Sequence, residues 1–229
     1  METLKSLRST AETRVDEYTD PAKTYSFRTY DIAPLNTGDT LRAEDILAAN
    51  LLSLRLGWQQ VVPLFAKGEG AAQSLLTRLN DALVSSRRAA SFEDIPSEEE
   101  LDGAFVAIAA ANRASVVVKG WTPVTVSKVL HRHAPHFIPI VDSRVRAFYD
   151  VRPGDEAELR RRLWRDITSN IDWIRPLAER YQTTDGRALT VLRLVDMIIW
   201  TSLPSETDHI ERAVHGDVAV DGPYLDQTR

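Results

Sequence analysis

The sequence predicts an all-α protein built as a helical bundle. Three observations favour this fold class. Apolar residues recur at helical spacing along most of the chain, capping residues precede several of these segments, and turn residues rather than strand-like alternation separate them. With 229 residues, of which 43% are hydrophobic, the chain is long enough to bury a sizeable core.

The first half of the chain is predicted to contain one extended segment followed by helices. Residues 25–40 (YSFRTYDIAPLNTGDT) alternate aromatic residues before Asn, Gly and Asp, a pattern typical of a short extended segment that enters a loop. Helices are expected at 41–56 and 71–86 from their apolar periodicity. A helix at 98–113 is expected because Pro96-Ser97 and three glutamates form a start signal.

The second half is predicted to be helical throughout. Further helices are expected at 124–132, 143–150, 155–167 and 187–203. Thr122-Pro123 and Gly154-Asp155 act as start signals for two of them. In the last helix, apolar residues at helical spacing predict a buried stripe, and Asp196 within it is expected to be a buried or half-buried hydrogen-bond partner. The stripe consists of Leu192, Val195 and Ile199.

A short acidic, proline-containing stretch at 91–100 separates the two groups of helices. We therefore predict an N-terminal helical region at 1–95 that packs onto a core at 96–205, followed by a C-terminal tail at 206–229. We expect these parts to form one compact unit.

Composition excludes several classes of protein. The chain has no cysteine, which excludes disulfides, thiolate zinc sites, cysteine nucleophiles and cysteine-ligated iron–sulfur clusters. Three histidines lie in HRHAPH (131–136), but Pro135 breaks the spacing and no acid adjoins them, so we predict no metal and no cofactor. We expect these histidines on a turn between helices, near the basic part of the chain.

The N-terminus and the charge distribution indicate location and partner. METLKSLRSTAETRVDEY has no apolar region of the kind found in signal peptides, and no apolar run is long enough to span a membrane, so a cytoplasmic protein is expected.

Residues 113–165 carry eleven Lys and Arg against five acids, a local charge of +6 in a chain of net charge −5. This asymmetry predicts one basic face that meets phosphates. The alternative is that RRRLWR (160–165) is only a solvated helix face.

Residues 118–146, VKGWTPVTVSKVLHRHAPHFIPIVDSRVR, carry the candidate site. Gly120 opens a turn before a helix, a geometry in which backbone N–H groups point outward and bind phosphate. In the helix, Ser127 and Lys128 are expected to face outward. Asp142 follows a proline-containing approach at the start of the next helix, where it is either an N-cap or a functional carboxylate.

This stretch resembles the hairpin and catalytic aspartate of the helix-hairpin-helix DNA glycosylase superfamily. Gly120 matches the first hairpin glycine, and Pro139-Ile140-Val141-Asp142 matches the approach to the catalytic aspartate, at the same separation of 22 positions. The resemblance covers about 30 residues. Over about 31–200, the chain also resembles a family of uncharacterised bacterial, mainly actinobacterial, proteins with SK-L and P-x-x-DS-x-V signatures.

The glycosylase resemblance implies DNA as partner and Asp142 as the catalytic residue. Trp121 and Thr122 replace the central aliphatic residue and the second glycine of the hairpin, and Val124 stands where bifunctional members carry their Schiff-base lysine. A monofunctional glycosylase is therefore implied. The predicted DNA-binding residues are Gly120, Trp121, Thr122, Lys128, Arg144 and Arg146. Candidates for a base-displacing wedge are Trp121, Tyr149 and Trp164.

Two hypotheses for function remain at this level. In the first, the protein hydrolyses an N-glycosidic bond in DNA with Asp142. In the second, it is a non-catalytic helical module that binds nucleic acid or a protein partner, and Asp142 only caps its helix and pairs with Arg144 or Arg146.

Overall fold

The structure, a computed structural model, describes residues 3–32 and 35–203. The prediction of an all-α protein is confirmed: over these residues the regular structure is helical, and the only β-type pairing is an isolated bridge between Gln182 and Ala188. The predicted tail at 206–229 lies outside the described residues. In the described part of the chain, each helix is too short or too polar to cross a membrane.

The α-helices are α1 (Leu4–Leu7), α2 (Ala11–Thr19), α3 (Ala43–Leu47), α4 (Trp58–Phe65), α5 (Ala71–Arg88), α6 (Glu98–Ala104), α7 (Val106–Ser115), α8 (Pro123–His131), α9 (Ser143–Tyr149), α10 (Glu156–Ser169), α11 (Ile171–Glu179) and α12 (Val191–Ser202). Four short 3₁₀ helices accompany them: η1 (Arg8–Thr10), η2 (Ser26–Arg28), η3 (Ala48–Leu52) and η4 (Phe92–Asp94).

Several expected elements differ from those observed. The extended segment predicted within 25–40 is wrong, because its described residues form η2 and turns. The helix expected at 98–113 is divided at Phe105, whose ring packs against Phe137 at 4.5 Å between ring centroids. The helix expected at 41–56 stops at η3, because Ser53 adopts a left-handed conformation with φ 63°.

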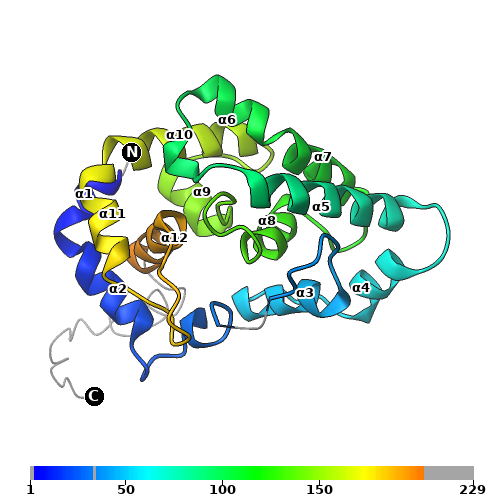
Figure 1. The fold of residues 1–229 in the computed structure, drawn as a ribbon, viewed down its shortest axis with the longest axis horizontal. Helices are drawn as coiled ribbons and strands as arrows, with labels where there is room; N and C mark the ends of the chain where they lie inside the picture. The colour runs from blue at the N-terminus through cyan, green and yellow to red at the C-terminus, as the bar shows by residue number, and fades with distance from the viewer. Residues whose placement is uncertain (1–2, 33–34, 204–229) are drawn as a thin grey trace, which may run out of the picture.

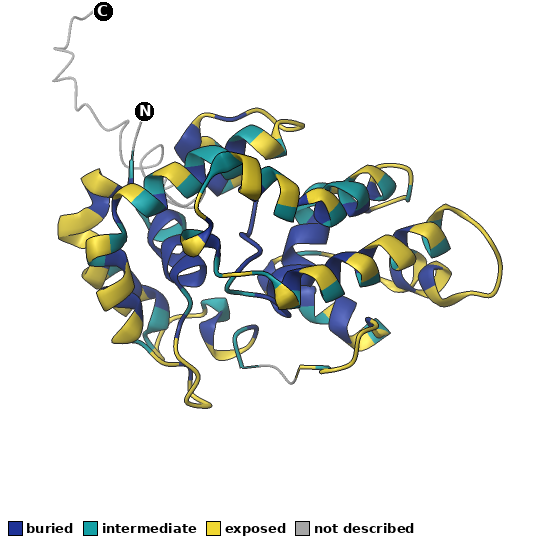
Figure 2. Ribbon diagram, turned by 45° about the horizontal axis from the view of Figure 1, so that its top comes forward, coloured by how far each residue is buried: buried dark blue, intermediate teal, exposed yellow. Residues whose placement is uncertain are grey.

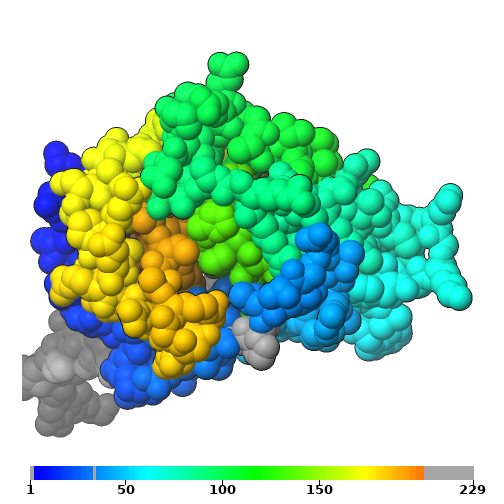
Figure 3. Space-filling view, viewed as in Figure 1, coloured from blue at the N-terminus to red at the C-terminus, as the bar shows by residue number. Residues whose placement is uncertain are grey.

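The helices form two groups that share one hydrophobic core (Figure 1). One group contains α3, α4, α5, α7 and α8, and the other contains α1, α2, α9, α10, α11 and α12. In the second group α2 packs on α12, so the N-terminal segment lies beside the last helix, and Figure 3 shows the blue N-terminal helices on the same side of the molecule as yellow α11. Segments far apart in the sequence therefore build this half together.

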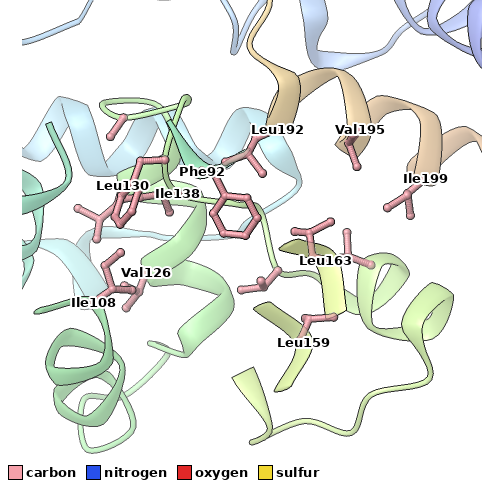
Figure 4. Close-up of a cluster of buried hydrophobic side chains, with 14 of the residues drawn as sticks. Phe92, Ile108, Val126, Leu130, Ile138, Leu159, Leu163, Leu192, Val195 and Ile199 are labelled. Atoms are coloured by element: carbon pink, nitrogen blue, oxygen red, sulfur yellow. The ribbon is translucent and has the colours of Figure 1, made fainter. Parts of the chain in front are cut away.

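The two central helices, α8 and α12, are almost wholly buried (Figure 2). The predicted packing of the 98–113 region on the next helix is confirmed, since α7 contacts α8. Figure 4 shows side chains of α7, α8, α10 and α12 meeting in the core, with Phe92 of η4 among them. The predicted stripe of Leu192, Val195 and Ile199 is confirmed as part of this core.

Candidate functional site

The Gly120 turn packs against α4. Gly120 has φ +80°, and a Cβ there would lie 2.7 Å from the Gln60 side chain. The Trp121 indole is buried, and its Nε1 donates a hydrogen bond to the Gln60 carbonyl at 3.1 Å. Thr122 Oγ1 caps α8 by accepting from the Thr125 backbone N–H. Trp121 is therefore a core residue, which corrects the expectation that its ring faces DNA.

The other wedge candidates are also held by the protein. Tyr149 is buried and donates to Asp166, while Trp164 is half-buried and donates from Nε1 to the Ile95 carbonyl. A wedge must be exposed to enter a base stack. None of the three predicted aromatic residues has that exposure in the described structure.

Asp142 begins α9 and is anchored there. Its backbone is extended, and its Oδ1 accepts hydrogen bonds from the backbone N–H groups of Arg144 at 3.0 Å and Val145 at 3.1 Å. These bonds satisfy two N–H groups that the helix itself leaves unpaired. The expected N-cap geometry is therefore present.

The ion-pair partner of Asp142 is Lys128. Lys128 Nζ lies 3.7 Å from Asp142 Oδ2 and donates a hydrogen bond to the Leu52 carbonyl at 2.9 Å. The expectation that Ser127 and Lys128 face outward is wrong: both are buried, and η3 packs over this part of α8 and leaves Lys128 8% exposed. The ammonium ion thus lies inside the protein, next to the carboxylate.

The two arginines of α9 have other partners. The Arg144 guanidinium lies 4.2 Å from the centre of the Trp200 ring and donates to the Trp200 carbonyl at 2.5 Å. Arg146 forms an ion pair with Glu156 at 2.8 Å. The expected pairing of Asp142 with Arg144 or Arg146 is therefore replaced by the Lys128 pair.

A cavity of about 510 Å³ brings these residues together. It lies between the two groups of helices of Figure 1, and is lined by α2, α8, α9 and α12 together with residues near η2 and η3. Of the residues predicted to form the site, Lys128, Asp142, Arg144 and Arg146 line it. Val124, at the position of the Schiff-base lysine, lines it too. Gly120, Trp121 and Thr122 are not part of this lining.

An aromatic wall, which we define as Tyr18, Tyr25 and Trp200, forms one side of the cavity. The two tyrosine rings stack at 4.8 Å between centroids, and Trp200 meets Tyr25 edge-on at 5.3 Å. These residues come from α2, the segment before η2 and α12, which is why sequence reasoning did not group them. Because Arg144 lies over the Trp200 ring and the tyrosines stack on each other, the wall is a packed aromatic cluster beside charged groups.

Asp196 of α12 is a further acid in the cavity lining. One of its oxygens, Oδ2, accepts a hydrogen bond from Arg193, a buried arginine whose Nε and Nη2 also bind Asp31 at 2.7 and 2.6 Å. Its other oxygen, Oδ1, is buried and has no hydrogen-bond partner among the described residues. Burial raises the pKa of Asp196 to about 7, with Asp142 nearby adding to the rise and Arg193 opposing it.

Asp196 was expected to be a buried hydrogen-bond partner, and it is one. What the sequence did not indicate is its place beside Asp142. The available signal was an arginine three residues before an acid in an otherwise apolar helix, a pattern that indicates a buried charge pair.

Of the histidines of 131–136, His133 and His136 occupy the expected turn, whereas His131 is the last residue of α8; His131 and His133 are buried. His131 donates from Nδ1 to the Ile138 carbonyl at 2.5 Å, and burial lowers its pKa to about 3. His133 lies 3.7 Å from Asp45, and burial lowers its pKa to about 4. Across the described residues, no three His, Asp or Glu side chains are grouped to hold a metal ion.

Part of the positive charge of residues 113–165 is neutralised by ion pairs with acids outside that segment. Arg160 and Arg161 both bind Asp102, and Arg165 binds Glu98 at 2.5 Å. Asp102 and Glu98 lie in α6, outside the segment whose charge was counted. The local excess of arginine is therefore partly used to join α10 to α6.

Comparison with other proteins supplies one relationship. Neither the curated proteins nor the solved structures contain a match to this chain. A family model described as a family of unknown function, DUF6308, matches residues 11–203, which include the cavity and both of its aspartates. The chain belongs to this family.

Proposed function

We propose that the protein acts on DNA as a monofunctional glycosylase in which Asp142 is the catalytic carboxylate. The observation that carries the proposal is the position of Asp142: one oxygen is fixed by the start of α9, while the residue lines a cavity with an aromatic wall. Cavities of a few hundred Å³ bind small molecules, so a single extruded base has room in a cavity of about 510 Å³.

The chemistry requires a carboxylate that stays ionised. Cleavage of the C1′–N bond builds positive charge on the sugar, which a nearby carboxylate stabilises while it orients the attacking water. The backbone N–H groups that donate to Oδ1 hold the carboxylate of Asp142 in one orientation. Lys128 Nζ lies 3.7 Å from Oδ2, beyond hydrogen-bond distance. Its charge therefore holds the carboxylate in place without a hydrogen bond to Oδ2.

Hydrolysis is favoured over lyase chemistry. A Schiff base needs an amine that is free to attack the sugar, but Lys128 donates to the Leu52 carbonyl and pairs with Asp142, so its contacts are with the protein. Val124, at the position of the lysine in bifunctional glycosylases, has no amine. The spacing of Gly120 and Asp142 and the order of α8 and α9 support the resemblance on which this proposal draws.

The second candidate function is a non-catalytic binding module. The N-cap hydrogen bonds and the Lys128 pair give Asp142 a structural role that needs no reaction. Under this alternative the cavity binds a ligand and releases it without a chemical reaction.

The test is base release from DNA. Wild type and Asp142→Asn are incubated with oligonucleotides that carry a panel of deaminated, oxidised and alkylated bases, and abasic sites are then cleaved with alkali. We expect strand breaks at a modified base from wild type only, because the amide keeps the cap but cannot stabilise the cation.

A matched control is available at the other end of the same helix. Asp150 is exposed and left-handed at φ 50°, a conformation that asparagine tolerates, so Asp150→Asn makes the same chemical change outside the cavity. It is expected to release base like wild type. Equal release by wild type and Asp142→Asn would refute the catalytic role, and no release by wild type on any substrate would favour the binding module.

A further inference from the structure

Arg146 brings unused hydrogen-bond donors to the cavity. Its side chain is 12% exposed and lines the cavity, and its Nη2 donates to Glu156 at 2.8 Å. Its Nε and Nη1 have no hydrogen-bond partner among the described residues, and neither nitrogen is enclosed by the protein. A guanidinium group carries five N–H donors, so Arg146 keeps donors that a ligand in the cavity can use.

Asp142, Ser143 and Arg146 line the cavity from the same part of α9. The backbone N–H of Arg146 donates to the Asp142 carbonyl at 3.0 Å, across the first turn of the helix. Ser143 is exposed and lies three residues before Arg146, and residues at this spacing are neighbours with about 5–6 Å between their Cβ atoms. The Ser143 hydroxyl and the Arg146 guanidinium therefore lie on the side of the cavity that also holds the Asp142 carboxylate.

The charges of the lining favour an anion at Arg146. Three cations line the cavity, Lys128, Arg144 and Arg146, against two acids, Asp142 and Asp196. Glu156, the acid paired with Arg146, is not part of the lining. An anion in the cavity can therefore bind the remaining donors of Arg146 while the ion pair stays in place. Phosphate oxygens accept strong, charge-assisted hydrogen bonds from arginine.

We propose that Arg146, together with the Ser143 hydroxyl, binds the phosphate group of the nucleotide on whose sugar Asp142 acts. The inference rests on the proposed function in taking the anion to be a phosphate attached to that sugar. Such a phosphate is only a few bonds from the anomeric carbon, so its binding site belongs next to the carboxylate. The phosphate is a diester in a DNA strand or a monoester in a free nucleotide, and the same side chains would bind either.

The affinity for phosphate-bearing ligands tests this separately from the reaction. In phosphate-free buffer, wild type is titrated by calorimetry with inorganic phosphate, deoxyuridine and deoxyuridine 5′-monophosphate. Binding of an oligonucleotide with a tetrahydrofuran residue, which has no glycosidic bond to cleave, is followed by fluorescence anisotropy. The monophosphate or the oligonucleotide is expected to bind at least about tenfold more tightly than deoxyuridine. Tighter binding of the monophosphate would identify a free nucleotide as the source of the phosphate, and tighter binding of the oligonucleotide would identify DNA.

Four substitutions separate phosphate binding from the ion pair and from general charge. Arg146→Gln is expected to weaken binding of the phosphate-bearing ligands at least about tenfold and to leave deoxyuridine unaffected. Glu156→Gln breaks the same ion pair but keeps the guanidinium, so it should bind these ligands as tightly as wild type or more tightly. Arg152→Gln removes an exposed arginine outside the lining and should match wild type. Thermal melts report folding, and if Arg146→Gln does not fold, Ser143→Ala tests the subsite by an expected loss of a few-fold.

The inference is overturned if wild type binds none of the phosphate-bearing ligands, or if Arg146→Gln, or Ser143→Ala in its place, binds them as wild type does. A loss in Glu156→Gln as large as that in Arg146→Gln would also overturn it, because the ion pair alone would then explain the effect. These outcomes are separate from the fate of the proposed function. Phosphate binding that depends on Arg146 without any base release would refute only the reaction. Base release by Arg146→Gln with the rate and affinity of wild type would refute only the inference.

Discussion

Replacing Asp196 by asparagine should make the protein gain stability relative to wild type as the pH rises through 7. The folded protein keeps the Asp196 proton up to about pH 7, whereas an aspartate has an ordinary pKa of 3.8. The difference of about 3 pKa units corresponds to about 4 kcal/mol at about 1.4 kcal/mol per unit. Because the folded state binds the proton more tightly, this contribution is fully present below about pH 4 and is lost as the pH rises through 7.

Asparagine does not titrate, so the variant does not lose this stability as the pH rises. The free energy of unfolding of Asp196→Asn minus that of wild type should therefore be up to about 4 kcal/mol larger at pH 8 than near pH 4. The measurement is the free energy of unfolding in urea, followed by circular dichroism at several pH values between these limits. Asp150→Asn, an exposed control, should run parallel to wild type. Parallel curves for Asp196→Asn and wild type would refute the reasoning that burial holds the proton.

Three further substitutions test the local geometry by urea unfolding. Gly120→Ala should lower the free energy of unfolding by about 1–2 kcal/mol, because φ is +80° and the new Cβ meets Gln60. The control, Gly103→Ala, replaces a helical glycine with open space around it and should be neutral or stabilising. Equal effects of the two substitutions would contradict this. Lys128→Met should cost about 1–3 kcal/mol by leaving Asp142 without its counter-charge, and no loss would mean that the pair contributes nothing. Asp142→Ala should cost about 1 kcal/mol more than Asp142→Asn, which keeps the cap; identical stabilities would exclude a cap contribution.

Local signals in the sequence predicted much of the fold. Residues 71–86 and 143–150 carry apolar periodicity or a capping aspartate, and helices α5 and α9 form there. Helices α4 and α11 were missed because each contains a proline, Pro63 or Pro176, within its span. Each proline lies past the first turn of its helix, a position where proline usually indicates the end of a helix.

Only those features of the candidate site that depend on neighbouring residues in the sequence could be predicted. The N-cap geometry of Asp142 follows from its place before Ser143, and the structure has it. The burial of Lys128 depends on η3, which lies 76 residues from it at the Leu52 carbonyl. Likewise, the place of Asp196 depends on the packing of α12 against α9. Contacts between segments this far apart leave no periodicity in a single sequence.

The charge of residues 113–165 likewise did not predict which side chains form ion pairs. A stretch of net charge +6 predicted a basic face, but Asp102 and Glu98 of α6 pair with arginines of α10. Such pairs cannot be assigned from composition, because they depend on which helices are neighbours.

The most direct test of the account is the rate at which base is released under single-turnover conditions by wild type, Asp142→Asn and Asp142→Ser. Asparagine and serine both cap helices, so the two variants keep α9 but lack the carboxylate. The account predicts release by wild type, at least about 100-fold slower release by both variants, and oligonucleotide binding within a few-fold of wild type for all three. Release by either variant at the wild-type rate would contradict it.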